Sequence, residues 1–188
     1  AVAKRKQQEM AALASKKSKN KKNVQSEKEE NAPKKKKAAD DNSPHQILRN
    51  YVNSGDRSTM EILDEIKRIS LAREFDAKKK LQLTLEALCV MDTLETFVES
   101  LKTQKAILSM FTSNSSDAEL FMAVLEEFVC KRNAESMLDK VYKILACIYD
   151  EEIVSDEDII AWADKPAMDA MFVEVDDGEK IRERAAPF

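Results

Sequence analysis

The hydrophobic residues of this chain recur at helical spacing from residue 44 to the end, whereas residues 1–43 hold few aliphatic residues and no aromatic ones. Apolar residues three and four positions apart predict amphipathic helices that each bury one face. The expected faces are, in chain order, Ile62/Ile66/Ile69, Leu81/Leu85/Leu88, Leu94/Phe97/Val98/Leu101, Ile107/Leu108/Phe111, Leu120/Phe121/Val124/Leu125/Phe128 and Met137/Leu138/Val141/Leu145/Ile148. An even succession of helices with short joints predicts an all-α fold, a stack of antiparallel helix pairs with one core.

Polar residues at the expected helix starts support these boundaries. Ser43 is suited to cap the first helix, with Pro44 at its first position. Ser58 and Glu61 have the spacing of a capping box for the next helix. Asp117 is expected to open the sixth helix.

Composition narrows the chemistry that the chain can support. Two glycines in 188 residues exclude a G-x-G-x-x-G dinucleotide loop, and neither glycine begins a G-K-[ST] phosphate cradle. His45 is the single histidine, and Cys89, Cys130 and Cys147 lie far apart without a C-x-x-C pair. Structural zinc and a Cys-His nucleophile pair are therefore poorly supported, and each cysteine is expected to be a buried apolar residue. We expect no catalytic residues, no metal and no cofactor.

The segment from Ile144 to Trp162 carries the strongest functional signal. The triplet Asp150–Glu152 marks the end of one helix, and Ser155 is placed to cap a second helix that begins with Asp156–Asp158. Acidic residues in the first turn of a helix interact favourably with the helix dipole, by roughly 0.3–1 kcal/mol each. Acidic residues at a helix C-terminus interact unfavourably with it. Local stability thus does not explain the first triplet, whereas a basic partner would.

Acidic residues are concentrated in this part of the chain. Residues 144–188 hold 13 acidic and 4 basic residues, a net charge of −9, against −2 for residues 45–143. A solvated surface is the simplest explanation of a charge run, but this local density favours a docking surface. Trp162 has two possible roles, closing the last helix pair by packing on Ile148 and Ile159, or anchoring a partner beside the acids. The candidate partner-binding residues are Tyr149, Asp150, Glu151, Glu152, Asp156, Glu157, Asp158 and Trp162.

The same segment resembles the first aromatic-acidic box of the C-terminal HEAT-type domain of translation initiation factor 5, the epsilon subunit of initiation factor 2B and the initiation factor 4G family. The matching residues are Tyr149, Asp150, Ile153, Ser155, Glu157, Ile159, Ile160 and Trp162. Residues 179–188 look like the entry to the second box, but the chain stops at Phe188, where the family continues with a Trp and glutamates. The resemblance implies a HEAT-like domain over residues 44–188, with the first box at 144–162.

Within that family, initiation factor 5 fits best, because a basic linker precedes the domain and the chain ends in IRERAAPF. The resemblance implies a monomeric protein-interaction domain that docks the lysine boxes of the beta subunit of initiation factor 2 and contacts initiation factors 1 and 3. The full protein would activate the GTPase of initiation factor 2 through an N-terminal domain that this chain lacks. The alternative is the epsilon subunit of 2B, a nucleotide-exchange factor. Because the chain begins at Ala1 inside a charged tail, we expect it to be the C-terminal portion of a longer protein.

Residues 1–43 are expected to form a disordered Lys-rich linker, since they contain too little apolar surface to fold. Residues 1–44 hold 13 basic and 6 acidic residues, a net charge of +7. The candidate contacts to ribosomal RNA are Lys16, Lys17, Lys19, Lys21, Lys22, Lys34, Lys35, Lys36 and Lys37. A solvated tether without a partner is the competing interpretation, and an RNA-tethered adaptor is a second functional hypothesis. With no long apolar run and no signal sequence, we expect a cytoplasmic protein.

Overall fold

The computed structural model describes residues 43–132 and 137–188, and these residues form helices and no strands. The α-helices are α2 (Pro44–Asn53), α3 (Thr59–Ala72), α4 (Ala77–Leu88), α5 (Leu94–Thr103), α6 (Lys105–Leu108), α7 (Ser115–Arg132), α9 (Val141–Asp150), α10 (Asp156–Asp164) and α11 (Val175–Ala185). Three 3-10 turns, η1 (Ser109–Phe111), η2 (Leu138–Lys140) and η3 (Ala167–Asp169), connect them. The all-α prediction is confirmed. The linker predicted for residues 1–43 lies outside the described residues, except for Ser43.

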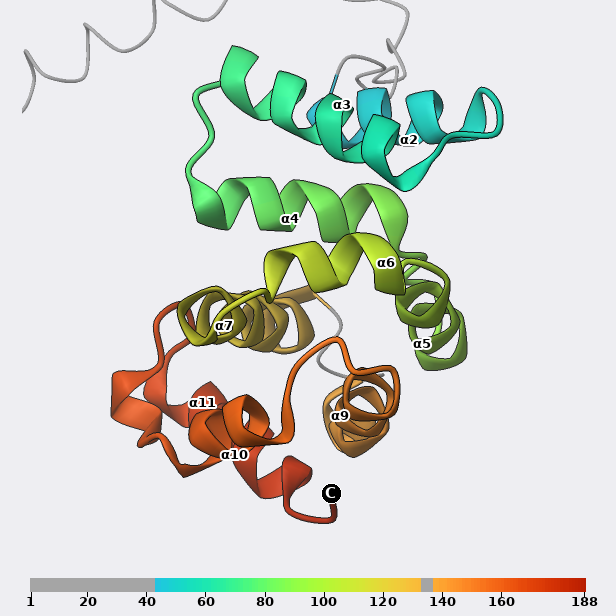
Figure 1. The fold of residues 1–188 in the computed structure, drawn as a ribbon. Coiled ribbons are helices and arrows are strands. Elements are labelled where there is room, and N and C mark those ends of the chain that lie inside the picture. The colour runs from blue at the N-terminus through green and yellow to red at the C-terminus, as the bar shows by residue number, and fades with distance from the viewer. Residues whose placement is uncertain (1–42, 133–136) are drawn as a thin grey trace, which may run out of the picture. The chain divides into compact units, whose positions relative to one another are not determined.

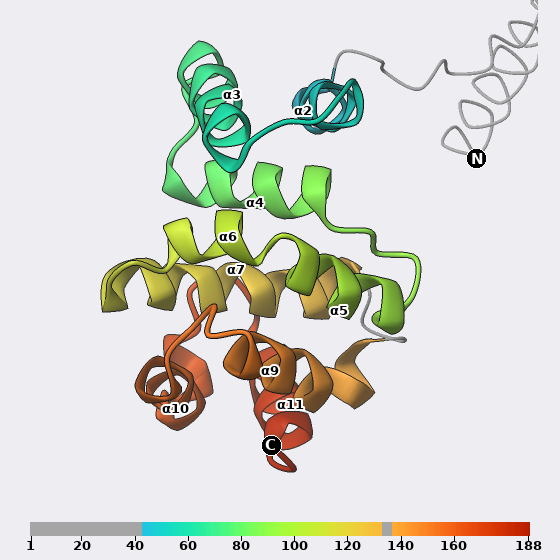
Figure 2. The same ribbon diagram turned by 45° about the vertical axis from the view of Figure 1, so that its right-hand side comes forward.

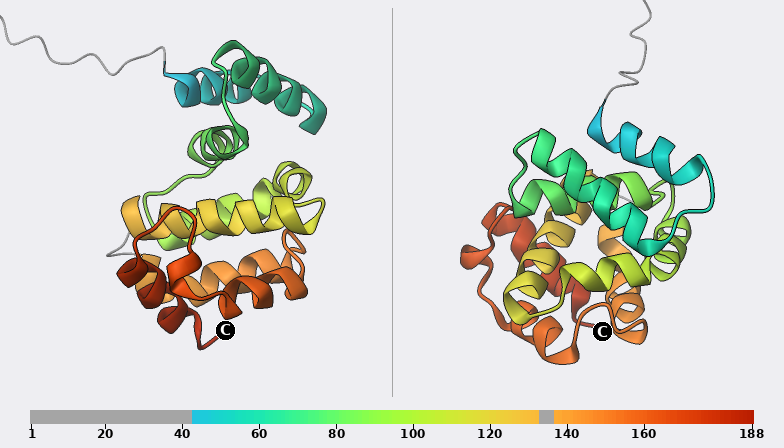
Figure 3. Two further views of the ribbon diagram at one scale, coloured as in Figure 1. Left: turned by 90° about the vertical axis from the view of Figure 1, so that its left-hand side faces the viewer. Right: turned by 45° about the horizontal axis from the view of Figure 1, so that its top comes forward.

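The helices lie in successive layers. Figure 1 shows α2 and α3 at one end, α4 beneath them, then α5 to α7, and α9 to α11 at the other end. The turned view of Figure 2 and the left view of Figure 3 show the same order, with the C-terminus beside α11. Helices α9, α10 and α11 therefore form the last layer, whose outer side is free of any other described helix. This layer carries the acidic segment.

Two of the predicted helix starts are confirmed, and one is wrong. The N–H of Glu61 donates to the Ser58 hydroxyl and the Glu61 carboxylate accepts from the Ser58 N–H, which completes the predicted capping box. Helix α2 begins at Pro44 as predicted, but the Ser43 hydroxyl does not cap it by a hydrogen bond and lies 3.2 Å from His45 Nε2 instead. Helix α7 begins two residues before Asp117, because the Asn114 side chain accepts from the Asp117 N–H and so caps the helix instead.

Two predicted helices, the one with Ile107, Leu108 and Phe111 and the one from Met137 to Ile148, are shorter than expected. The segment with Ile107 and Leu108 forms the four-residue α6 followed by η1, and the Thr112 hydroxyl donates to the Ile153 carbonyl, which ties the end of this turn to the chain after α9. Met137 is buried, but Leu138 lies in η2, and the α-helix itself begins at Val141.

The buried residues form two clusters rather than the single core expected from the sequence. The smaller cluster joins α2, α3 and α4 through residues such as Leu48, Ile66 and Leu83. The larger cluster extends from α4 to α11 and includes Phe97, whose ring stacks on that of Phe128 at a centroid distance of 6.0 Å. Phe111 packs against both clusters. The residues that surround the acidic segment belong to the larger cluster.

No helix in the described ranges 43–132 and 137–188 is both long enough and apolar enough to cross a membrane.

Candidate protein-docking surface

The first acidic triplet closes α9 with a tight C-terminal turn. The Ile153 N–H donates to the Ile148 carbonyl and the Glu152 N–H donates to the Tyr149 carbonyl, both at 2.9 Å. This is a Schellman motif, in which the residue after the cap adopts a left-handed conformation. Glu152 occupies that position with φ of 52°, where glycine is the usual residue. The turn buries Ile153 while Glu152 stays exposed.

The second acidic triplet begins α10, as predicted. The Ser155 hydroxyl accepts from the Asp158 N–H at 3.2 Å and donates to the Asp158 carboxylate at 2.7 Å. All three acids lie in the first helical turn, where backbone N–H groups point toward them. The two triplets are therefore separated only by the buried pair Ile153–Val154 and by the cap.

The structure leaves most of these carboxylates open to solvent. Asp150, Glu152, Asp156 and Glu157 are exposed, and no ion pair joins them to any residue in the described ranges. Glu151 is half-buried and pairs with Lys105 of α6, 3.7 Å from carboxylate to Nζ. The uncompensated charge is therefore contributed by both triplets and attracts cations to the end of this layer.

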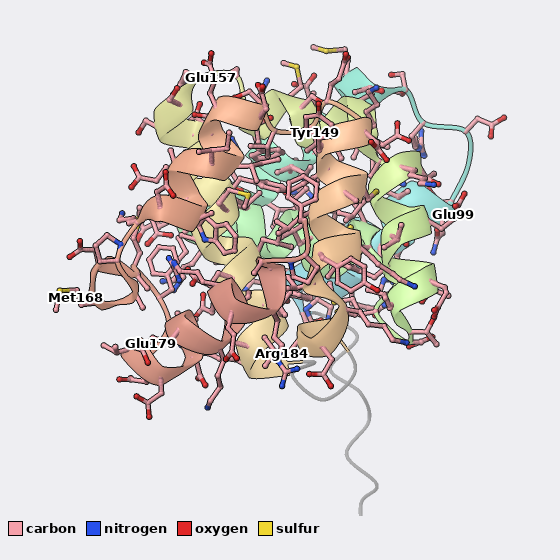
Figure 4. The ribbon with its side chains drawn as sticks, turned by 90° about the horizontal axis from the view of Figure 1, so that it is seen from below. Glu99, Tyr149, Glu157, Met168, Glu179 and Arg184 are labelled. Carbon is pink, nitrogen blue, oxygen red and sulfur yellow. The ribbon has the colours of Figure 1, made fainter. Side chains whose placement is uncertain are left out.

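Tyr149 and Trp162 take different places relative to these acids. Tyr149 is 47% exposed, and its ring meets that of Phe188 edge-on at a centroid distance of 6.0 Å. Figure 4 shows Tyr149 on α9 and Glu157 on the neighbouring α10 toward the same edge of the last layer. Trp162 is only 7% exposed and packs in the larger cluster with Ile148 and Ile159. The structure thus gives Trp162 the first of its two predicted roles, and its contact with a partner stays a prediction.

Arg182, which the sequence analysis did not select, supports Trp162 from α11. Its guanidinium carbon lies 5.2 Å from the centre of the Trp162 ring. Its Nη1 donates to the Glu126 carboxylate of α7 at 2.5 Å and to the Gly178 carbonyl at 2.8 Å, and its Nε donates to the Lys165 carbonyl. No local pattern signals this contact, because Glu126 and Arg182 are 56 residues apart.

Two hollows flank α10. A groove of about 570 Å³ lies between α9, α10 and α11 and is lined by Asp156 and Tyr149 among others. A smaller cavity of about 180 Å³ lies toward α7 and is lined by Asp158 and Glu119. Acids of one helical turn thus border both hollows. Trp162 and Arg182 line both and form the wall between them.

The entry to the second predicted box forms α11. Gly178 on this helix lies close to η3, where a Cβ added to it would come within 3.3 Å of the Ala167 Cβ. A larger residue would push α11 away from the chain that follows α10. The small residue thereby allows Arg182, one turn later, to reach Lys165 and Glu126.

The three cysteines are free, and two of them are buried. Burial raises the pKa of the Cys89 thiol to about 12 and, with help from Asp177 and Glu126, that of Cys130 to about 11. Thiols with such pKa values are weak nucleophiles at neutral pH. Across residues 43–132 and 137–188, no group of three His, Cys, Asp or Glu side chains is arranged to hold a metal ion. The candidate RNA contacts from Lys16 to Lys37 lie outside the described residues.

Part of the chain is similar to a known protein family. Residues 117–188 match the family model described as W2: eIF4-gamma/eIF5/eIF2-epsilon. The match thus begins inside α7 and includes both acidic triplets, Trp162 and α11. No curated protein sequence matches the chain.

Among solved structures, the fold is similar to one described as the C-terminal domain of translation initiation factor 5 at low pH. The TM-score is 0.56 at 21% sequence identity, and the match covers 78% of this chain and 88% of that one. Together, these matches confirm the resemblance and the HEAT-like fold predicted from the sequence. Residues 117–188 are thus similar to the W2 family of translation initiation factors, and the chain has a fold similar to that of the initiation factor 5 C-terminal domain.

Proposed function

We propose that the surface formed by Tyr149 and the two acidic triplets docks lysine-rich segments of other translation initiation factors. The observation that carries this proposal is that Asp150, Glu152, Asp156 and Glu157 are exposed, close in sequence and without an ion pair in the described ranges. Such a field raises the local concentration of a polycationic segment and accelerates its association.

The proposed ligands are the lysine boxes of the beta subunit of initiation factor 2, and initiation factors 1 and 3 are further proposed partners. In this proposal the W2 domain works as a monomer in the cytoplasm and assembles the preinitiation complex. It contributes binding and no chemistry. GTPase activation of initiation factor 2 would come from an N-terminal domain of the full protein. The family match and the acidic surface support this proposal over a catalytic role.

The test is to neutralise the two triplets and measure binding to a lysine-box peptide from the beta subunit. The test variant replaces Asp150, Glu151, Glu152, Asp156, Glu157 and Asp158 by the corresponding amides. The matched control replaces six exposed acids of α3, α5 and the joints beside them, namely Asp56, Asp64, Glu74, Asp92, Glu95 and Glu99. Both variants change the net charge by the same amount, so they differ only in where the charge is removed.

Calorimetric titration at two salt concentrations should show a large loss of affinity for the test variant and a small one for the control. The affinity of the unmodified chain should also fall steeply with salt, because the screening length is only about 8 Å at physiological strength. Equal affinities for the test variant and the unmodified chain would overturn the proposal. Equal losses in both variants would reduce it to an effect of net charge.

An RNA-tethered adaptor is the second candidate, because the lysine clusters of residues 16–22 and 34–37 would release counterions from RNA. Deletion of residues 1–40 distinguishes the two functions. It should weaken RNA binding and leave lysine-box binding in place if the acidic surface is the docking site. Loss of lysine-box binding on deletion would favour the adaptor.

A further inference from the structure

The groove between α9, α10 and α11 is apolar inside and exposes large apolar side chains at its rim. Leu145 and Ile159 are buried at its walls. Tyr149, Ile160 and Phe188 are 47%, 58% and 49% exposed along it. Its volume of about 570 Å³ is large enough to receive a bulky side chain.

One face of α10 places a carboxylate on each side of the exposed isoleucine. Asp156, Ile160 and Asp164 follow at intervals of four residues and all line the groove. At 1.5 Å per residue, the two aspartates lie about 12 Å apart along the helix, with Ile160 midway. Both aspartates are exposed and neither has an ion pair among the residues that the structure describes. This face of α10 therefore carries an apolar residue between two acidic residues.

The charges around the groove indicate the chemistry of its occupant. Among the described residues, the only basic side chain that lines it is Arg182, and Glu126 already neutralises that guanidinium. An acidic occupant would meet Asp156 and Asp164 without compensation. A purely polycationic occupant would leave Ile160 and Tyr149 exposed to water. A segment that carries an apolar residue between two bases satisfies all three positions.

We propose that this groove binds a protein segment in which one bulky apolar residue lies between two lysines or arginines. The inference rests on the proposed docking function and adds the sequence pattern that the surface selects. The apolar side chain enters the groove beside Ile160 and Tyr149, and the two bases pair with Asp156 and Asp164.

The spacing of the two aspartates sets the spacing of the two bases. In an extended peptide, residues i, i+2 and i+4 project to the same side, and i and i+4 are about 13 Å apart. This matches the separation of about 12 Å along α10. The preferred pattern is therefore base-x-apolar-x-base, with all three side chains on one side of the peptide.

Three synthetic peptides of equal charge test this pattern. The first has Lys-Ser-Leu-Ser-Lys at its centre, the second has Lys-Ser-Ser-Ser-Lys, and the third has Lys-Leu-Ser-Ser-Lys. The third has the composition of the first, but a shift of one residue turns the leucine to the opposite side. Titration should show the first peptide binding about tenfold more tightly than either of the others, the effect of burying one leucine. Equal affinities for the three peptides would overturn the inference.

Variants of the protein complete the test. Ile160→Ser should abolish the preference for the first peptide, whereas Leu71→Ser, which removes an 84% exposed leucine from α3, should leave it unchanged. Asp164→Asn should weaken the binding of all three peptides. An unchanged affinity in that variant would contradict the proposed pairing. Self-association of the free protein that Ile160→Ser removes would also overturn the inference, because a second copy would then occupy the groove.

The proposed function fails on a different result. If neutralising both acidic triplets leaves the binding of every peptide unchanged, the acidic surface is not the docking site. If neutralising the triplets lowers the affinity but the position of the leucine in the peptide does not affect it, docking is electrostatic. In that case only the inference about the groove is wrong.

Discussion

Arg182 of α11 forms a buried ion pair with Glu126 of α7, with 2.5 Å between Nη1 and the carboxylate. The Glu126 side chain is 2% exposed. The same guanidinium lies over the Trp162 ring and donates to the carbonyl of Lys165, at the end of α10. One side chain therefore connects α10 and α11 to α7. The position of the docking surface depends on this contact.

Removing one partner of this pair should destabilise the domain strongly. Arg182→Met leaves the Glu126 carboxylate buried without its cation, and such losses amount to about 3–5 kcal/mol. The double variant Arg182→Met with Glu126→Leu should recover part of that loss, because no unpaired charge then remains buried. Urea unfolding of the single and double variants gives the coupling free energy. Strict additivity of the two single effects would contradict the role assigned to the pair.

Trp162→Ala should also reduce the free energy of unfolding, by about 3–5 kcal/mol, because it empties a buried aromatic site. Trp162→Phe should cost much less, since a phenyl ring still fills much of the site and Nε1 has no hydrogen-bond partner among the described residues. Thermal unfolding of both variants checks the order. If Trp162→Ala melts like the unmodified chain but loses the lysine-rich peptide, Trp162 is an interface residue rather than a core residue.

The domain should lose stability in acid as the Glu127 carboxylate of α7 becomes protonated. Burial raises the pKa of its carboxyl, but hydrogen bonds from Lys78 and Lys131 outweigh burial and hold the pKa below the ordinary value of 4.5. A lowered pKa contributes stability above 4.5 that is lost as the pH falls through the folded value.

Glu127→Gln should therefore lower the free energy of unfolding at pH 7 by roughly 1 kcal/mol, allowing for the partial exposure of the lysines. The difference between this variant and the unmodified chain should shrink as the pH falls below 4.5. Denaturant titrations at a series of pH values measure it, and a difference independent of pH would show that the charge of Glu127 is unimportant.

Local chemistry made some of these features predictable and left others without a signal. The Ser58 capping box and the Ser155 cap are encoded within four residues, and the sequence was sufficient to place them. The pair of Glu126 and Arg182 joins distant segments, so no spacing rule could indicate it. Gly178 gave no sign of its close approach to Ala167, because it lies in a helix interior, where glycine is normally only a weak helix former.

The left-handed turn at Glu152 was hidden for a different reason. A Schellman turn is recognised in a sequence by glycine, and this chain has glutamate there. The acidic triplet Asp150–Glu152 still located the end of α9, which the structure places at Asp150. The triplet thus indicated where the helix stops but not how the chain turns.

A comparison of Glu152 with Glu74 separates the effect of a left-handed residue on stability from the effect of its charge on binding. Both residues are exposed, follow a helix end and adopt left-handed conformations, with φ of 52° and 53°. The turn at Glu74 repeats the hydrogen bonds of the turn at Glu152, since Phe75 donates to the Ser70 carbonyl and Glu74 to the Leu71 carbonyl. A left-handed conformation costs a residue other than glycine about 1–2 kcal/mol.

Glu152→Gly and Glu74→Gly should each raise the free energy of unfolding by roughly 1 kcal/mol, since relief of the strain exceeds the added entropy of the unfolded chain. Only Glu152→Gly should weaken binding of the lysine-box peptide, because Glu74 follows the end of α3, away from the acidic surface. Glu152→Gln keeps the strained backbone and removes the charge, so it should weaken binding with little gain in stability. Chemical denaturation and calorimetric titration of the three variants measure both effects. If Glu152→Gly gained stability and bound the peptide as tightly as Glu74→Gly does, the acid at this strained position would have no part in docking.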